Sequence, residues 1–390
     1  MSTGQVAFTE SEERQELRKQ VAKLAASYGR EWFTERARAG EKTTELWLEI
    51  GRNGYLGINI PEEHGGGGGG IGDIAAVCEE LAAQGCPLLL MVVSPAICGT
   101  VISRFGTDEQ KRRWLPGLCD GTGTMAFAIT EPDAGTNTHN ITTTARRDGD
   151  GWVLKGQKIW ISGVDEADNV LVVARTEDAR TGKLKPCLFV VPTDAEGLEH
   201  TPIPMEIVSP ERQFQVFLDD VRLPADALVG DENGGLVQLF AGLNPERIMA
   251  ASFSTGLARY ALERATAYAK ERTVFQTPIG AHQAVAHPLA QSHIEIEMAR
   301  LMTQKAAALY DAGDEMAAGE AANMAKYAAA EAACDAVDRA VQTHGGYGIS
   351  QEYGMAGLLV ATRAGRIAPV SREMILNFVA MHSLGLPKSY

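Results

Sequence analysis

The sequence predicts an α+β protein in which two helical regions flank a middle β region. Two observations predict this order. Short segments rich in β-branched and aromatic residues, separated by Gly, Asp and Pro, occur in the middle of the chain and are typical of strands. Segments with helical periodicity occupy both ends, and the later ones are long and rich in alanine. We therefore divide the chain into a helical domain over 1–124, an antiparallel β domain over 125–236 and a helical bundle over 237–390.

The first region contains helical patterns over 9–50 and 73–120, with breaks at 85–87 and 106–107. Six consecutive glycines, Gly65–Gly70, lie between these patterns, and such a run forms neither a helix nor a strand core. The run formally satisfies GxGxxG. No GK[ST] follows it and no strand pattern precedes it, so a phosphate-binding loop is weakly indicated.

Four segments predict the strands of the middle region: GWVLKGQKIWIS, NVLVVART, KPCLFVVPTD and RQFQVFLDDVRLP. The last region is predicted to be helical from Pro245 to about Leu384, with long segments over 246–273, 283–312 and 318–344. At its start, GLNPERIMA offers Asn244 as an N-cap, Pro245 at the first helical position and Glu246 as a complement to the helix dipole.

Composition disfavours several classes of partner. The chain has 390 residues, 45% hydrophobic content and a net charge of −14, which disfavours binding to a nucleic-acid backbone. No Lys/Arg run indicates a membrane surface, and the most apolar segment, Pro87–Ile97, is too short to cross a bilayer. The six cysteines form no CxxC and the polar N-terminus has no signal-peptide core, so we expect a cytoplasmic protein with reduced thiols.

Motifs for metal binding and for nucleophilic hydrolysis are also missing from the sequence. The eight histidines are dispersed, and no HExxH, Cys/His cluster or GxSxG is found. His282, His287 and His293 are close in sequence, but their spacing does not place them on one helix face. We therefore expect no metal site.

The segment from Met125, MAFAITEPDAGTNTHNITTTARRDGDGWVLKGQKIWISG, resembles the acyl-CoA dehydrogenase family, which has TEPxAGS/T followed by G-x-K-x-W-I-T/S. Two further matches follow in order, AKERTVFQTPIGAHQAV and AAEAACDAVDRAVQTHGGYGIS. The resemblance implies a helical domain, a β domain and a C-terminal four-helix bundle. It also implies bound FAD, an acyl-CoA substrate, an electron-transfer flavoprotein or similar acceptor, and a homotetramer built as a dimer of dimers.

The same resemblance implies a set of cofactor-binding residues. A flavin is a flat, polarisable ring edged with hydrogen-bonding atoms, and the residues matched to it are Phe127, Ile129, Thr130, Trp160 and Ser162. The residues matched to the dinucleotide, in part from a neighbouring subunit, are Arg272, Phe275, Gln283, Gln342, Gly345, Gly346, Ser371 and Glu373. Without the resemblance, a strand aromatic in a core is the preferred interpretation of Trp160. The alternatives for the other residues are a solvated helix-end cation for Arg272 and a helix C-cap and turn for the two glycines.

The resemblance also implies a carboxylate that removes the α-proton of the acyl-CoA while the β-hydride passes to flavin N5. Most members carry this Glu late in the chain, in a stretch like IYEGT. The corresponding stretch here is RIAPVSRE, which places Pro369 where that Glu is expected. A smaller set, similar to isovaleryl- and long-chain acyl-CoA dehydrogenases, has the Glu directly before an Arg at the start of the bundle. Glu246 is then the base, and the matched substrate-binding residues are Thr136, Asn244 and Arg247.

Two questions stay open at this point. A helix N-terminus favours ionised Glu246, whereas enclosure raises its pKa. Pro369 also lacks the N–H that polarises the thioester carbonyl in the commoner enzymes, so Val370 or a flavin ribityl hydroxyl takes that task, or the reaction differs. The alternatives to dehydrogenation are an enoyl-CoA reductase, an oxidase, a monooxygenase and an FAD-binding subunit of a hetero-oligomer.

Overall fold

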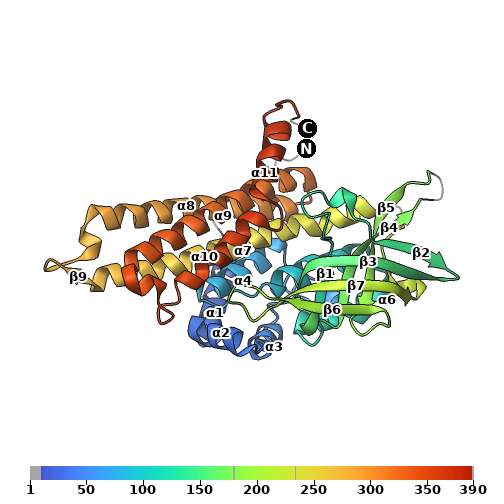
Figure 1. Ribbon diagram of the computed structural model, residues 1–390, viewed down its shortest axis with the longest axis horizontal. Coiled ribbons are helices and arrows are strands. Elements are labelled where there is room, and N and C mark those ends of the chain that lie inside the picture. The colour runs from blue at the N-terminus through green and yellow to red at the C-terminus, as the bar shows by residue number, and fades with distance from the viewer. Residues whose placement is uncertain (1–9, 179–180, 233, 389–390) are drawn as a thin grey trace.

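The structure, a computed structural model, describes residues 10–178, 181–232 and 234–388. Helices fill one side of the elongated molecule and a β-sheet lies at the other (Figure 1). The first region is helical, as predicted. Its α-helices are α1 (Glu12–Ala26), α2 (Gly29–Ala39), α3 (Thr44–Arg52), α4 (Ile71–Ala83), α5 (Thr100–Phe105) and α6 (Asp108–Asp120), with a π-helical segment at Val92–Gly99.

The six-glycine run forms a tight loop that leads into α4. Gly65 and Gly68 have φ values of 87° and 68°, which glycine adopts without strain. The N-terminus of α4 is already capped by a protein carboxylate, because Asp311 accepts hydrogen bonds from the backbone N–H groups of Ile71 and Gly72 at 2.7 and 3.0 Å. The position that a phosphate would take is therefore filled.

The middle region forms one sheet with the strand order β6-β7-β3-β2-β4-β5-β8, and β1 adds to β4. The strands are β1 (Met125–Ala128), β2 (Thr144–Asp148), β3 (Gly151–Ser162), β4 (Asn169–Glu177), β5 (Leu184–Pro192), β6 (Leu198–Ile203), β7 (Gln213–Leu223) and β8 (Leu228–Val229). The predicted antiparallel arrangement holds for most pairs, but β1 and β2 each run parallel to β4. Both reach β4 by long connections, which parallel pairing requires.

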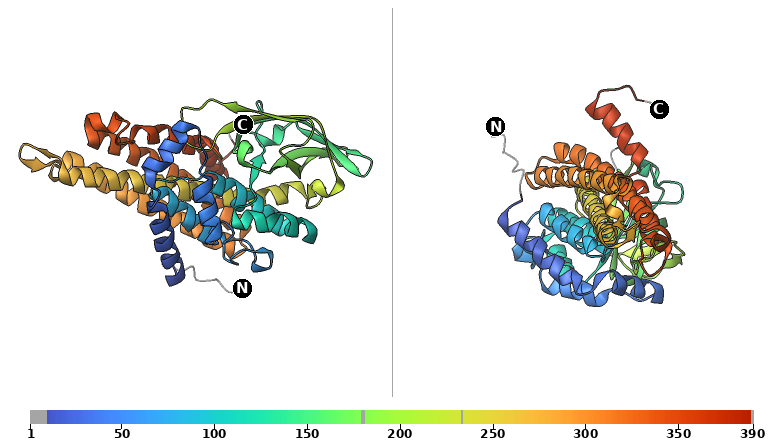
Figure 2. Two further views of the ribbon diagram at one scale, coloured as in Figure 1. Left: turned by 90° about the horizontal axis from the view of Figure 1, so that it is seen from below. Right: turned by 90° about the vertical axis from the view of Figure 1, so that its left-hand side faces the viewer.

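The last region is a bundle of α7 (Gly235–Glu271), α8 (Gln283–Asp311), α9 (Glu315–His344) and α10 (Ala356–Ile367), followed by α11 (Arg372–Phe378). Many facing positions on these helices are buried alanines, whose small side chains allow close approach. The short hairpin β9 (Thr273–Val274) and β10 (Thr277–Pro278) projects from the end of the bundle opposite the sheet (Figures 1 and 2).

The predicted start of the first bundle helix is wrong. Helix α7 begins at Gly235, so Asn244 is not an N-cap and Pro245 lies inside the helix. A proline cannot donate to the carbonyl four residues earlier, here that of Ala241. The Tyr310 hydroxyl of α8 donates to this carbonyl at 2.9 Å, so the Ala241 carbonyl keeps a hydrogen-bond partner and the helix continues through Pro245.

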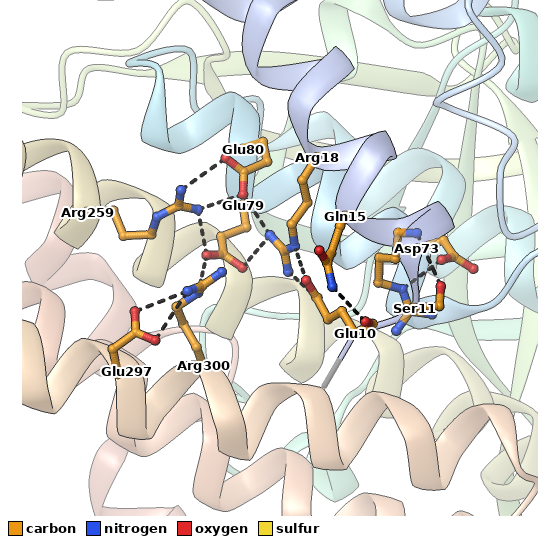
Figure 3. Close-up of polar contacts among 11 residues, drawn as sticks. Glu10, Ser11, Gln15, Arg18, Asp73, Glu79, Glu80, Arg259, Glu297 and Arg300 are labelled. Carbon is orange, nitrogen blue, oxygen red and sulfur yellow. Dashed lines mark hydrogen bonds and ion pairs between the residues drawn. The ribbon is translucent and has the colours of Figure 1, made fainter. Parts of the chain in front are cut away.

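A buried ionic cluster joins the first region to the bundle (Figure 3). The carboxylate of Glu79, on α4, accepts hydrogen bonds from Arg18 of α1 at 2.9 Å, Arg259 of α7 at 2.7 Å and Arg300 of α8 at 2.8 Å. Glu80 accepts from two of the same guanidinium groups. Burial alone would raise the pKa of Glu79, but the three arginines lower it. One ionised carboxylate thus holds four helices together.

We expect Glu79→Gln to lower the free energy of unfolding by about 3–5 kcal/mol, because breaking a buried ion pair leaves uncompensated buried charge. Urea unfolding of the FAD-loaded protein measures this. Glu297→Gln is the matched control, because Glu297 pairs with Arg300 at the cluster's edge and its side chain is 45% exposed. That variant should lose no more than about 1 kcal/mol. Equal losses in the two variants would contradict the central position of Glu79.

Candidate functional site

A cavity of about 2150 Å³ lies where the sheet meets the helical regions. Its walls come from the segment Pro87–Ile97, from β1 and β3, from α7 and α10, and from the loop before α11. The cavity is mostly apolar, with a few charged groups. Such a concave site with few polar groups is typical of a pocket for a small molecule or cofactor.

The two sequence motifs of the middle region meet along one wall of this cavity. The backbone N–H of Ile159, in β3, donates to the carbonyl of Thr130 at 3.0 Å. The fully buried Lys158 ammonium donates to the Ile129 carbonyl at 3.0 Å and pairs with Glu131 at 2.9 Å. These contacts fix the segment after β1 against β3.

Glu131 is the anchor of this wall. Besides Lys158, it accepts hydrogen bonds from the backbone N–H groups of Thr142 and Thr143 at 2.5 and 2.9 Å. Burial would raise the pKa of Glu131, but the Lys158 ammonium and these donors lower it to about 2. The carboxylate is therefore ionised at neutral pH, and the lysine and glutamate of the two motifs hold the wall in place.

Trp160 presents its ring to the cavity. It has a φ of 61°, and the pairing of β3 with β7 is irregular between Lys158 and Ile161. Such irregularities redirect side chains near functional sites. The Trp160 side chain lines the cavity and the residue is 51% exposed, so it is not a core aromatic.

The Ser162 hydroxyl is paired with Gln213. The amide nitrogen of Gln213 lies 2.9 Å and its amide oxygen 3.2 Å from Ser162 Oγ. The two residues are register partners on β3 and β7, and both line the cavity. Sequence reasoning missed Gln213, because only the strand register brings it to Ser162.

Glu246 lies well inside α7 and faces the cavity. The helix N-terminus is too far away to favour its charge, since that effect is confined to the first turn. Burial raises the pKa of Glu246 to about 7, with Arg247 and Lys326 opposing the rise. The sequence left open whether a helix N-terminus or enclosure has the larger effect on the pKa of Glu246. In the structure, burial has the larger effect.

Lys326 connects Glu246 with the loop before α11. This lysine of α9 is 2% exposed, and its ammonium donates to the Val370 carbonyl at 2.5 Å. Burial lowers its pKa to about 8, against the opposing effect of Glu246. Pro369, Val370 and Ser371 all line the cavity. No motif marks Lys326, which lies in an alanine-rich helix.

Asn244 and Arg247 form a polar corner beside Glu246. Arg247 donates to the carbonyl of Leu243 at 3.1 Å and to the amide oxygen of Asn244 at 3.3 Å. The Asn244 amide also reaches Glu315 of α9 at 3.4 Å. Both residues line the cavity, and burial lowers the pKa of Arg247.

The predicted site residues fall into three groups. The main cavity is lined by Phe127, Ile129, Thr130, Thr136, Trp160, Ser162, Asn244, Glu246, Arg247 and Ser371. A second cavity, of about 640 Å³, is lined by Arg272, Gly345 and Gly346, together with Tyr268, His344 and Tyr347. The remaining predicted residues, which are exposed and line neither cavity, are Phe275, Gln283, Gln342 and Glu373.

The second cavity is lined by Val274 of the hairpin strand β9, so it lies at the hairpin end of the bundle. That end is opposite the sheet (Figure 1). Arg272 ends α7 and Gly345 follows α9, so both belong to that end. Tyr268 stacks on His344 with ring centroids 4.6 Å apart and forms an aromatic floor that sequence reasoning missed. Within one chain, the two groups of predicted cofactor residues are therefore far apart.

No cluster of three or more His, Cys, Asp or Glu suited to a metal ion is found among the described residues. In the same part of the chain, no helix is long and apolar enough to cross a membrane.

The chain matches three domain families in succession: acyl-CoA dehydrogenase N-terminal domain over residues 11–122, middle domain over 126–221 and C-terminal domain over 233–384. It is 66% identical to acyl-CoA dehydrogenase FadE12 of Mycobacterium tuberculosis over 98% of this chain and 99% of that protein. It is 33% identical to the 3-(aryl)acrylate reductase of Clostridium sporogenes over 85% and 89% of the two chains. A glutaryl-CoA dehydrogenase of Mycobacterium smegmatis in complex with FADH2 superposes with a TM-score of 0.90 at 27% identity, over 98% and 96% of the chains.

Proposed function

The chain belongs to the acyl-CoA dehydrogenase family, and on that premise we propose that it oxidises an acyl-CoA thioester to the trans-2-enoyl-CoA with Glu246 as the base. It is an FAD-dependent oxidoreductase acting on acyl-CoA. The observation that carries the proposal is a half-buried carboxylate, Glu246, facing the cavity that the Trp160 wall also lines. Electrons then leave for an electron-transfer flavoprotein or a similar acceptor.

The main cavity fits a flavin. Trp160 and Phe127 offer apolar ring faces, and the Ser162 hydroxyl, supported by Gln213, offers a polar contact. The Trp160 indole is exposed and its backbone has a positive φ, so the side chain does not pack in a core. It can instead cover one face of a planar ring. FAD supplies the acceptor for the β-hydride when bound.

Glu246 is suited to remove an α-proton at neutral pH. A base is most effective when its pKa lies near the working pH, and the pKa of Glu246 is about 7. Pro369, at the usual place of the base, has no group that accepts a proton. Arg247 and Lys326 lower the pKa of Glu246 and so keep a useful fraction of its carboxylate ionised.

Groups near Glu246 bind and orient the thioester. Asn244, Arg247 and Thr136 line the same cavity and offer hydrogen-bonding side chains to the CoA portion. Among the described residues, the backbone N–H of Val370 has no hydrogen-bond partner, while its carbonyl is held by Lys326. This N–H is available to the thioester carbonyl in place of the donor that Pro369 lacks.

Reduction of an enoyl group is the second candidate function. The 33% identical relative is named a 3-(aryl)acrylate reductase, and a base that removes an α-proton can return one in the reverse direction. Analysis of products from acyl-CoA and enoyl-CoA, with and without oxygen, separates dehydrogenase, reductase and oxidase.

Assembly into a homotetramer completes the cofactor site in this proposal. Arg272, Gly345 and Gly346 lie at the hairpin end, whereas Trp160 and Ser162 lie beside the sheet. A single FAD uses both groups only if they come from two chains. An exposed apolar stripe on α8, formed by Ile294, Met298 and Leu301, offers a further surface for a second copy.

Dissociation of the assembly should release FAD, because each cofactor loses the Arg272 end of its site. Analytical ultracentrifugation over a dilution series, with flavin fluorescence recorded in parallel, measures both events. Arg272→Met should weaken FAD binding while the assembly persists. A flavin-loaded monomer would contradict the shared site.

Glu246→Gln should slow flavin reduction by a good acyl-CoA about 10²–10⁴-fold, because it removes a positioned base and keeps the side chain's size. Rapid mixing, followed at the flavin's visible band, measures this step. Glu320→Gln, the same substitution on another cavity-lining carboxylate, is the control and should react within a few-fold of the parent. If Glu246→Gln also reacts within a few-fold, the base lies elsewhere, with Glu315, which also lines the cavity, the next carboxylate to test.

The acid limb of the pH profile for flavin reduction should lie near pH 7, since Glu246 acts only when ionised. Lys326→Met removes a positive charge that lowers the pKa of Glu246, so the limb should move to higher pH. The control is Lys305→Met at an exposed position of α8, which should leave the limb in place. An unmoved limb in Lys326→Met would show that Lys326 does not act on the base.

A further inference from the structure

Arg30, on α2, is a buried cation that lines the main cavity and has no carboxylate partner among the described residues. The residue is 9% exposed. Among the residues that the structure describes, no carboxylate lies within 4.0 Å of its guanidinium and its buried Nε has no hydrogen-bond partner. Its guanidinium lies over the Phe33 ring, whose centroid is 5.4 Å away, and it interacts electrostatically with Tyr260 and Cys86. Burial lowers the pKa of Arg30, which is the sign of a charge that is poorly compensated.

Three neighbours place Arg30 near the Leu257 end of the cavity wall that α7 forms. Its Cβ packs against Gly85, where an added side chain would come within 2.6 Å. Pro87 and Leu89, just after that glycine, line the cavity. On α7, Leu257 lines the cavity and Tyr260, one turn further on, interacts electrostatically with Arg30.

The distance from the base follows from the geometry of α7. Glu246, Ala250, Phe253 and Leu257 line the cavity at the spacing of one helix face. Residues 246 and 257 are three turns apart, or about 16 Å. The wall between the two ends is therefore largely apolar, with a carboxylate at one end and Arg30 near the other.

The protein's own carboxyl groups do not neutralise Arg30. Glu211 also lines the cavity, but its two oxygens accept hydrogen bonds from the backbone N–H groups of Leu89 and Leu90 at 2.7 and 2.8 Å. Burial raises the pKa of Glu211 to about 8, against the opposing effect of these two hydrogen bonds. The guanidinium is thus free to pair with a ligand.

We propose that Arg30 binds a carboxylate at the far end of the acyl group, so that the preferred substrates are CoA monothioesters of long dicarboxylic acids. A guanidinium forms its strongest pairs with carboxylates, by two parallel N–H···O bonds. The apolar wall along α7 fits the methylene chain between the thioester and this carboxylate. The inference rests on the proposed function, because it takes Glu246 as the point where the α-carbon lies.

The experiment compares pairs of acyl-CoA thioesters of equal chain length that end in a methyl group or in a carboxylate. The FAD-loaded protein, Arg30→Met and Arg38→Met are assayed for kcat/KM with an artificial electron acceptor. Arg38 is an exposed arginine of the same helix whose charge helps to lower the pKa of Arg30, so it serves as the control for loss of a nearby positive charge. Calorimetric titration with non-oxidisable thioether analogues of the same pairs measures binding apart from turnover.

The parent protein should prefer the carboxylate-ended member once the chain is long enough to span about 16 Å. Arg30→Met should lose about 10- to 100-fold in kcat/KM and in affinity for that member alone, as expected for a charge-assisted hydrogen bond. Arg38→Met should keep the preference, and FAD content should be equal in all three proteins.

Two results overturn the inference while leaving dehydrogenation intact. One is oxidation of both members with no preference at any length, and the other is a preference that survives in Arg30→Met. Loss of FAD from Arg30→Met alone would also overturn it, since Arg30 would then serve the cofactor. If no member of either series reduces the flavin, the proposed function itself fails.

Discussion

The ionic cluster around Glu79 is the interaction on which the cavity depends. It fixes α4 to α1, α7 and α8, and the cavity wall Pro87–Ile97 follows α4 in the chain. One carboxylate and three guanidinium groups, together with the buried apolar residues of α4 and α7, therefore hold that wall relative to the Glu246 face of α7. Each charge is costly to bury alone, but together they are satisfied.

In the candidate site, by contrast, some charged groups are fully paired and others are not. Glu131 is surrounded by donors and stays ionised, whereas Glu246 has only two positive neighbours and its pKa rises to about 7. Arg30 has no anionic partner among the described residues. Where a charge is fully paired, as at Glu131, it holds a wall of the cavity in place. Where a charge is not fully paired, as at Glu246 and Arg30, the group is available to react with or to bind a ligand.

Much of the fold was predictable because it follows from local pattern. The strands β3, β4, β5 and β7 and the long helices α8 and α9 lie close to where periodicity placed them. The start of α7 was not predictable in this way, since Asn244, Pro245 and Glu246 have the local chemistry of a helix N-terminus. What overrides that chemistry is the Tyr310 hydroxyl, which comes from a distant part of the chain.

The site was predictable only where a family motif marks it. The resemblance named Trp160, Ser162 and Glu246, and the structure brings all three to one cavity. Lys326, Gln213 and Arg30 carry no motif, and their roles depend on tertiary burial or on strand register.

A crystal structure of the protein with FAD and a non-oxidisable acyl-CoA analogue ending in a carboxylate would show which carboxylate faces the substrate. We expect the α-carbon between the flavin and the Glu246 carboxylate, with the acyl chain running along α7 toward Arg30. An α-carbon facing any other carboxylate, with Glu246 away from the substrate, would contradict this expectation.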